Sequence, residues 1–211
     1  LLIGFGIQDS ILPIVDKQSG QLTHNDLTIS LSDEKALTME QGLADTLDSS
    51  SAVHSWGAFY TKSTTLYNEE GGSADVSIVG AEDDARMTEY FTFRTRVGHN
   101  PIPFEEDSVI LTEKTALNLE LSVGDTFYVE AADGSRGQLT LTGITENYMF
   151  TRLYLSNAQL QALLEEMAWQ PGVLWFAVTD ENGKIIAHSD PQQVDNALYS
   201  PAQMRELHVS E

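Results

Sequence analysis

Histidine and carboxylate side chains are the residues of this sequence that could hold a metal ion. Five histidines occur, and none forms an HExxH or HxH motif or an i,i+4 pair. His188 and Asp190 lie close together after an expected strand, so a zinc ion could bind both if a third ligand came from elsewhere in the chain. His188 could equally make structural hydrogen bonds in its turn. We therefore treat the pair as a hypothesis and assign no metal, catalytic or cofactor-binding residue.

Nucleophilic and acid–base catalysis need side chains that converge on one point. Ser10 follows Asp9, but no Gly-x-Ser-x-Gly motif accompanies it. Neighbouring carboxylates such as Asp83-Asp84 and Glu165-Glu166 point to different faces of a helix or strand, and 32 acidic residues produce such pairs by chance. The glycines form no phosphate-binding run. The sequence predicts that the chain is not an enzyme and needs no cofactor.

The charge of the chain limits its partners. Its 211 residues include 32 acidic and 11 basic side chains, which gives a net charge of -21. Such a charge repels nucleic acid and anionic lipid headgroups, so no nucleic-acid partner is expected. Cysteine is absent, which excludes disulfides, thiol nucleophiles and Cys-based metal sites. The length suits one domain or two small ones.

The clearest structural pattern lies between residues 109 and 156. Val109–Leu111 is a short apolar run, and Thr112 can cap a following helix. Gly124-Asp125 marks a turn before a strand at 126–131. Asp133-Gly134 marks a second turn, after which Leu139 and Leu141 alternate with polar residues. This alternation predicts an antiparallel hairpin with one buried face and one exposed face.

Periodicity and turn residues predict the remaining elements. In chain order they are a helix over 1–19 interrupted at Pro13, a strand Leu27–Leu31, a helix Thr38–Leu47, a strand Val53–Tyr67, a turn Glu69–Gly72, a strand Ala74–Gly80, a helix Asp83–Phe93, an exposed loop Arg94–Glu106, a helix capped by Asn157, a strand Val173–Thr179, a return strand Lys184–His188 and a short helix Val194–Leu198. Together they predict an α+β fold with a mixed, mostly antiparallel sheet and helices packed on one face, with two lobes as one arrangement.

The apolar start of the sequence has two interpretations. Leu1–Ile7 can be the end of a membrane helix, or its extension beyond the membrane, joined to an extracytoplasmic domain. It can also be a buried N-terminal helix of a free-standing protein. No apolar run in the sequence approaches the roughly 20 residues that cross a bilayer.

Motifs in the first three quarters of the chain resemble one family. Gly4–Ile11 (GFGIQDSI) precedes the expected strand that ends in DLTISL, and TEKTA, VGDT, GITENY and LYLS follow in order. The residues that carry the likeness after position 111 are Thr112, Glu113, Lys114, Ala116, Gly124, Asp125, Gly143, Ile144, Glu146, Asn147, Tyr148, Tyr154 and Ser156. Residues 1–156 are similar to the large extracytoplasmic domain of FtsX/MacB-like ABC-transporter permeases.

Residues 157–211 resemble a different family. The similarity is dense over Leu163–Met204. One difference is Asp195, which stands at a position where that family has glycine. It rests on Gln170, Pro171, Gly172, Phe176, Asp180, Gly183, His188, Ser189, Asp190, Pro191, Val194, Leu198, Tyr199 and Pro201. This part looks like the periplasmic sensor of zinc-responsive histidine kinases of the ZraS type, which has a Cache-like (extracellular PAS) sheet. It is either a segment of a mosaic chain or a helix and hairpin that complete the permease domain.

The two resemblances imply two functions. The first implies a non-catalytic domain outside the cell membrane, coupled through a missing membrane part to an ATP-binding subunit and acting on an extracytoplasmic protein or a lipid or peptide substrate. The chain has no Walker motif, as this function requires. The second implies an extracytoplasmic ligand- or metal-sensing domain of a membrane signalling receptor. A secreted binding protein is a third possibility that the residues leave open.

Overall fold

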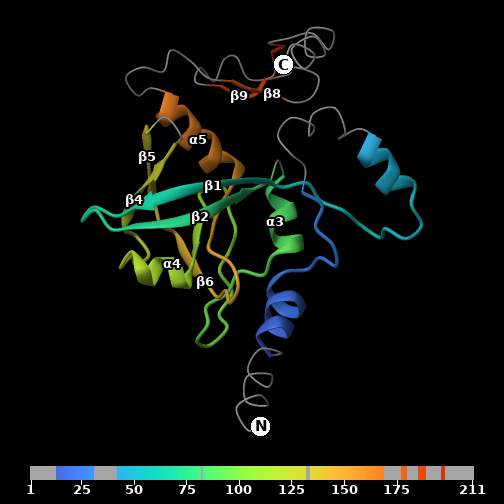
Figure 1. The fold of residues 1–211 in the computed structure, drawn as a ribbon, viewed down its shortest axis with the longest axis horizontal. Helices are drawn as coiled ribbons and strands as arrows, with labels where there is room; N and C mark the ends of the chain where they lie inside the picture. The colour runs from blue at the N-terminus through green and yellow to red at the C-terminus, as the bar shows by residue number, and fades with distance from the viewer. Residues whose placement is uncertain are drawn as a thin grey trace, which may run out of the picture. The chain divides into compact units, whose positions relative to one another are not determined.

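The computed structural model describes residues 13–30, 42–81, 83–131, 134–168, 177–179, 185–188 and 196–197 (Figure 1). The chain divides into two compact units. The first, which we call the sheet unit, consists of Leu1–Asp26 and Ala58–Leu163. The second consists of Leu27–Gly57 and Leu164–Glu211. The domain boundary expected at residue 156 follows from the two resemblances and stays a prediction.

Seven strands form one mixed sheet in the order β5-β4-β1-β2-β7-β3-β6. Their bounds are β1 Tyr60–Tyr67, β2 Ser73–Gly80, β3 Val109–Thr112, β4 Thr126–Glu130, β5 Arg136–Thr140, β6 Gly143–Thr145 and β7 Arg152–Leu155. The β2–β7 and β3–β6 pairs are parallel, and the other pairs are antiparallel. The expected α+β class with a mixed, mostly antiparallel sheet is therefore confirmed.

Turn residues set the two hairpins where the sequence predicts them. Between β1 and β2, Asn68 accepts a hydrogen bond from the Gly72 amide through its side chain at 2.6 Å, and Gly71 adopts a φ of 87°. Between β4 and β5, Gly134 has a φ of 82°. Buried and less buried residues alternate along both β4 and β5, so the half-exposed hairpin is confirmed.

One face of the sheet carries an aromatic cluster. Val79, Ile110 and Tyr154 lie on neighbouring strands in register, and all three are buried. Helix α3 (Asp84–Tyr90) packs on them through Met87 and Tyr90, followed by Phe91 and Phe93. The rings meet edge-on or tilted at centroid distances such as 5.0 Å between Phe93 and Tyr154. Because Phe91 and Phe93 are held in this cluster, the position of the following residue, Arg94, is fixed relative to the sheet.

The opposite face carries aliphatic side chains and helix α5 (Asn157–Ala168). Leu66, Leu111 and Leu153 occupy positions that alternate with those of the aromatic cluster, and each is fully buried. A side chain at Gly80 would lie 3.3 Å from Leu160, which shows how closely α5 approaches β2. Figure 1 shows α3 and α5 on different sides of the β1–β2 hairpin.

The capping at the helix starts differs from what the sequence predicts at two of three positions. Asp83 caps α3 by accepting from the Ala85 amide at 2.9 Å. Thr112 occupies the cap position of α4 (Glu113–Asn118), but its hydroxyl contacts the Thr115 hydroxyl and the Arg152 amide instead. The cap predicted at Asn157 is wrong by one residue.

Ser156 is the residue that caps α5. Its hydroxyl oxygen accepts from the Gln159 amide at 3.2 Å and donates to the Glu106 carbonyl at 2.6 Å. Asn157 is exposed and already helical, and its amide donates to the Asp84 carboxylate. Ser156 is therefore the cap of α5, and Asn157 is the first residue of the helix.

The strand predicted over Leu27–Leu31 is wrong for residues 27–30, which are irregular and exposed; Leu31 lies outside the described residues. The chain pairs earlier, at Thr23, which bridges Phe91. The His24 amide donates to the Tyr90 carbonyl at 2.9 Å, and this pairing ends before Leu27. An alternating pattern needs a partner strand, and none of the described strands reaches these residues.

Two further predicted bounds are corrected. The strand predicted over Val53–Tyr67 begins at Tyr60, because its partner β2 ends at Gly80, the residue opposite. The helix predicted over Asp83–Phe93 ends at Tyr90, and Phe91 is extended. The loop Arg94–Glu106 is exposed at residues 96–101, 103, 105 and 106, as predicted, and a bridge between Arg94 and Pro101 anchors it.

The second unit contains a helix over residues 42–49 and the antiparallel pair β8 (Ala177–Thr179) and β9 (Ile185–His188). These agree with parts of the predicted helix Thr38–Leu47 and of the two predicted strands. Trp56 Nε1 donates at 2.8 Å to the carboxylate of Asp48, which lies in the last turn of this helix. The predicted short helix Val194–Leu198 is not helical at residues 196–197, and its other residues lie outside those described.

The N-terminal helix begins among the described residues at Pro13 and widens into a π-helical turn, η1 (Gln18–Leu22). The two interpretations of Leu1–Ile7 concern residues outside the described part. Among the described residues, no helix has the length and apolar character that crossing a membrane requires.

Candidate functional site

A buried carboxylate, Glu146, lies at the centre of the most connected polar cluster in the described sheet unit. It follows β6, and its side chain is 0 % exposed. Arg94 donates from Nε to its Oε2 at 2.8 Å, and the Tyr148 hydroxyl donates to its Oε1. His99 Nε2 lies 3.9 Å from Oε2. Both oxygens are therefore occupied, which a buried carboxylate requires.

The ring of Tyr148 lies between two cations. The Arg96 guanidinium is 4.7 Å and the Lys17 ammonium 5.5 Å from the ring centroid. Arg96 also donates to the Glu113 carboxylate on α4 and to the Asn147 carbonyl, the latter at 3.4 Å. The cluster thus joins the loop after β6, the loop at 94–101, α4 and the N-terminal helix.

The π-helical turn is attached to the same cluster. Gln18 is 1 % exposed, and its Oε1 accepts from the Tyr148 amide at 3.0 Å. Its Nε2 donates to the Thr23 hydroxyl at 3.1 Å. Gln21 accepts from Arg94 Nη2 at 2.9 Å. The π-helical turn places both glutamines within hydrogen-bond distance of the cluster. Such turns are frequent at functional sites.

The chain around Glu146 is fixed by its neighbours in the sequence. Asn147 Oδ1 accepts from the amides of Met149 and Phe150 at 3.1 and 2.8 Å, which turns the chain towards β7. At Gly143 a side chain would lie 2.9 Å from Ile102, so glycine is required by close approach. These are residues of the GITENY motif, and each has a structural task.

Burial raises the pKa of the Glu146 carboxyl, and this is the largest single influence. The hydrogen bonds from Tyr148 and Arg94, the charge of Arg94 and, least, the nearby His99 oppose it and leave the pKa below its usual value. Burial raises the pKa of the Tyr154 hydroxyl, and Arg152 and Asn147 oppose that change. At neutral pH Glu146 is a carboxylate held by fixed donors, which suits a structural role better than proton transfer.

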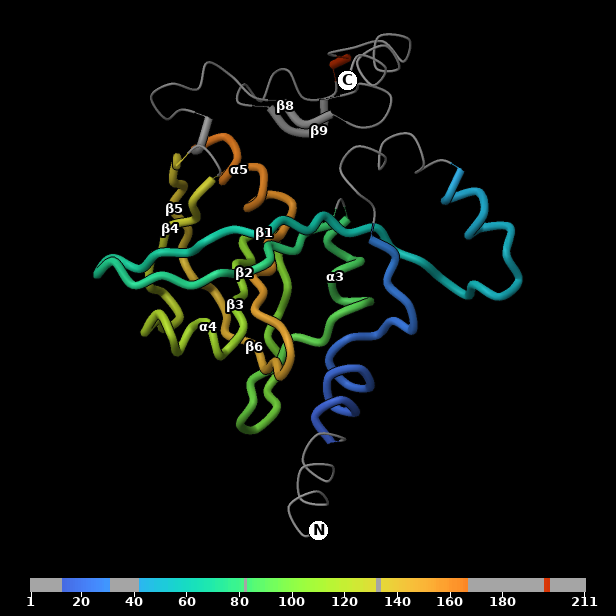
Figure 2. The backbone as a smooth tube through the Cα atoms, in the orientation of Figure 1, coloured from blue at the N-terminus to red at the C-terminus, as the bar shows by residue number. Residues whose placement is uncertain are grey.

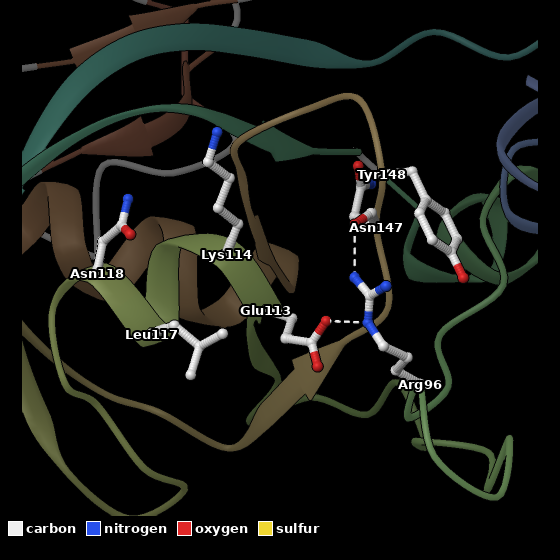
Figure 3. Close-up of a pocket in the computed structure, with 7 residues that line it drawn as sticks. All are labelled: Arg96, Glu113, Lys114, Leu117, Asn118, Asn147 and Tyr148. Atoms are coloured by element: carbon white, nitrogen blue, oxygen red, sulfur yellow. Dashed lines mark hydrogen bonds and ion pairs between the residues drawn. The ribbon is translucent and has the colours of Figure 1, made fainter. Parts of the chain in front are cut away.

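An open hollow of about 450 Å³ lies beside this cluster. It is lined by Arg96, Glu113, Lys114, Leu117, Asn118, Asn147 and Tyr148. Figure 3 shows Arg96 reaching from its loop to Glu113 on one side and Asn147 on the other, with Lys114 and Leu117 on α4. Cationic, carboxylate, amide, aromatic and apolar side chains therefore meet around one hollow.

The metal hypothesis for His188 and Asp190 stays a prediction. His188 is the last residue of β9 and is opposite Ala177, while Asp190 lies outside the described residues. Among the residues that the structure describes, no group of three or more His, Asp or Glu side chains could hold a metal ion. His24 contacts the Thr92 hydroxyl at 2.7 Å.

The neighbouring carboxylates Asp83 and Asp84 bind different partners, as expected for residues that are adjacent in sequence. Asp83 binds an amide of its own helix, whereas Asp84 accepts from the Asn157 amide at 2.8 Å. Ser10 and Asp9 lie outside the described residues. The sequence did not single out Arg94 or Arg96, because nothing in their spacing indicates partners 52 and 17 residues away. The GITENY motif, which contains Glu146, was the only available signal.

Comparison with known proteins finds both expected likenesses. A segment of 55 residues is 69 % identical to the sensor histidine kinase ZraS of Klebsiella oxytoca, and 57 residues are 63 % identical to ZraS of Escherichia coli K12. These segments cover 26 % and 27 % of this chain. The matches span only 12 % of each ZraS protein.

One solved structure with a likeness to the chain is the periplasmic region of MacB from Actinobacillus actinomycetemcomitans. The match covers 58 % of this chain and 56 % of that one, at 15 % sequence identity and a TM-score of 0.35. At that score the likeness carries no weight for fold or function. No family model matches the chain.

Proposed function

We propose that this chain is a non-catalytic extracytoplasmic domain of an ABC-transporter permease. In this role it couples ATP hydrolysis by a separate cytoplasmic subunit to an extracytoplasmic protein or to a lipid or peptide substrate. The proposal rests on one observation. The motif segments 112–125 and 143–156 are distant in sequence, yet β3 pairs directly with both β6 and β7.

Residues of different motifs are also connected through side-chain contacts. Glu113 binds Arg96, which contacts the ring of Tyr148, and Tyr148 in turn donates to Glu146. Residues that resemble a family because of chance matches would be scattered. These support one connected scaffold, and a scaffold tied to its own N-terminal helix suits the transmission of movement better than it suits catalysis.

The experiment begins with the complete gene. We expect further membrane helices on both sides of this segment, and an ATP-binding protein that copurifies from detergent with the full-length product. ATP hydrolysis by that complex should change when a protein is bound to the extracytoplasmic domain. A single membrane helix followed by a kinase domain would contradict the proposal.

The ZraS-like segment favours a second candidate, a ligand- or metal-sensing domain of a signalling receptor. This segment of 55 residues is 69 % identical to a ZraS sensor kinase. If a zinc site of micromolar affinity involves His188, a hundredfold excess of zinc over Kd should stabilise the chain by about 2.7 kcal/mol. His188→Ala should abolish that gain. An unchanged melting temperature with zinc would contradict the proposal that this domain senses a metal.

A further inference from the structure

We propose that one end of the sheet unit is a membrane-docking surface that binds anionic phospholipid headgroups. We call it the basic end. It comprises the loop 94–101, helix α4, the turn 146–152 and the start of η1. Figure 2 shows the loop 94–101 and the N-terminal helix running to the same end of the sheet unit. The contacts of Tyr148 with Lys17 and Arg96 join them directly.

Positive charge is concentrated at this end. The chain has only 11 basic residues in total. Five of them lie here: Lys17, Arg94, Arg96, Lys114 and Arg152. Glu146 and Glu113 compensate Arg94 and Arg96. Among the described residues, Lys17, Lys114 and the half-buried Arg152, whose Nη1 is buried, are in no ion pair, and the exposed acids Asp16 and Glu120 do not approach them within 4.0 Å.

Exposed apolar side chains surround these cations. They are Val97, Leu117, Met149 and Phe150, between 41 % and 84 % exposed. They project from three separate elements, at a loop tip, on α4 and in the turn before β7. Arg152 lies 4.1 Å from the ring centroid of Phe150. Cations interleaved with single apolar side chains suit an interface with headgroups and the upper acyl region, whereas an acidic protein helix would need a continuous apolar groove.

The net charge of -21 does not prevent this. At physiological ionic strength the Debye length is about 8 Å, so distant surface charges are screened and the local groups decide. The overall charge predicts repulsion from anionic lipid, and the basic end is the local exception. Repulsion by the rest of the surface would orient the chain with this end towards the bilayer. The inference does not rest on a permease function, because binding is measured on the chain itself.

The test is cosedimentation of the complete 211-residue chain with vesicles of phosphatidylcholine, with and without about one third phosphatidylglycerol. We expect binding only to the anionic vesicles, weakened as salt rises from about 0.05 to 0.5 M. Lys114→Glu should weaken binding about tenfold or more, since each cation near such a surface contributes roughly fivefold. Val97→Asp should weaken it as well.

Lys62→Glu is the matched control, because Lys62 is exposed on β1 and undergoes the same charge change. Lys114 and Val97 are exposed, so their variants should fold, which circular dichroism checks. Binding that is equal for both vesicle types, or equally weakened by Lys62→Glu and Lys114→Glu, would overturn the proposal. Capture of a soluble polyglutamate by the same residues, without vesicle binding, would also overturn it and indicate an acidic protein partner.

Discussion

The sheet unit contains two Arg–Glu–Tyr clusters whose chemistry is alike and whose burial differs. In the first, Glu146 accepts from Arg94 and Tyr148 and is 0 % exposed. In the second, Glu130 pairs with Arg136 at 2.8 Å and accepts from Tyr67 at 3.3 Å, with the carboxylate side chain 28 % exposed. Arg136 lies 3.9 Å from the centroid of the Tyr67 ring.

The two clusters connect different amounts of structure. The Glu130 cluster links β1, β4 and β5, which are already neighbours in the sheet. The Glu146 cluster links the N-terminal helix, the loop 94–101 and the turn after β6, which are not neighbouring strands of the sheet; the Glu146 amide also donates to the Arg94 carbonyl at 2.8 Å. A buried carboxylate that loses its partner leaves an uncompensated charge, whereas an exposed one is solvated. Burial should therefore decide which cluster matters for folding.

The largest expected effect is that of Arg94→Ala. Removing this partner from the buried Glu146 should lower the free energy of unfolding by about 3–5 kcal/mol. Urea denaturation followed by far-UV circular dichroism measures it, because all three tryptophans lie outside the sheet unit. Arg86→Ala, which breaks an exposed pair on α3, is the control and should leave the midpoint unchanged. Equal losses in both variants would contradict the comparison.

Tyr148→Phe should have the next largest effect. It removes the hydroxyl that donates to Glu146 and keeps the ring between Lys17 and Arg96. A hydrogen bond to a charged group contributes about 1.5–3 kcal/mol, so the unfolding free energy should fall by that amount. Tyr67→Phe makes the same change in the exposed cluster and should have little effect. If the Tyr67 variant loses as much, the hydroxyl matters irrespective of burial.

Gly143→Ala should destabilise the sheet unit through packing. The added methyl group would lie 2.9 Å from Ile102 and 3.3 Å from Ile110. Overpacking of this kind costs about 1–3 kcal/mol. Gly20→Ala is the control, because nothing lies within 4 Å of the added group and its φ is not positive. A neutral Gly143→Ala, measured in the same urea series, would show that β6 can move away.

The smallest effect is the contribution of Glu146 to acid sensitivity. Its folded pKa lies below the ordinary value of 4.5, so the unfolded chain binds this proton more readily. The stabilisation is complete above that ordinary pKa and is lost as the pH falls through the folded pKa. Unfolding free energy measured by urea titration at several acidic pH values should therefore decline less steeply in Glu146→Gln. A parallel decline would show that other carboxyls are responsible.

Local signals in the sequence predicted much of the fold. Asn68, Gly71 and Gly134 set the hairpins because their conformational preferences act within a few residues. The alternation along β4 and β5 predicted which face is buried. The same reasoning failed for Leu27–Leu31, because alternation does not indicate whether a partner strand exists.

The candidate site could be predicted only in part. Glu146, Asn147 and Tyr148 stood out as a motif, but their partners Arg94, Arg96 and Gln18 are distant in sequence, and no local rule connects them. Cap assignment at Ser156 rather than Asn157 likewise depends on Glu106, which only the folded chain brings close. Long-range polar contacts depend on topology, and topology was not readable from spacing.

Two double-mutant cycles test the central claim. It states that burial makes the Glu146 cluster a strong polar link between the N-terminal helix, the loop 94–101 and the turn after β6. One cycle combines Arg94→Ala with Glu146→Gln, and the other combines Arg136→Ala with Glu130→Gln. We predict a coupling energy of about 2–3 kcal/mol for the first, the upper part of the range for contacting groups, and no measurable coupling for the second. Equal coupling energies in the two cycles would contradict the account.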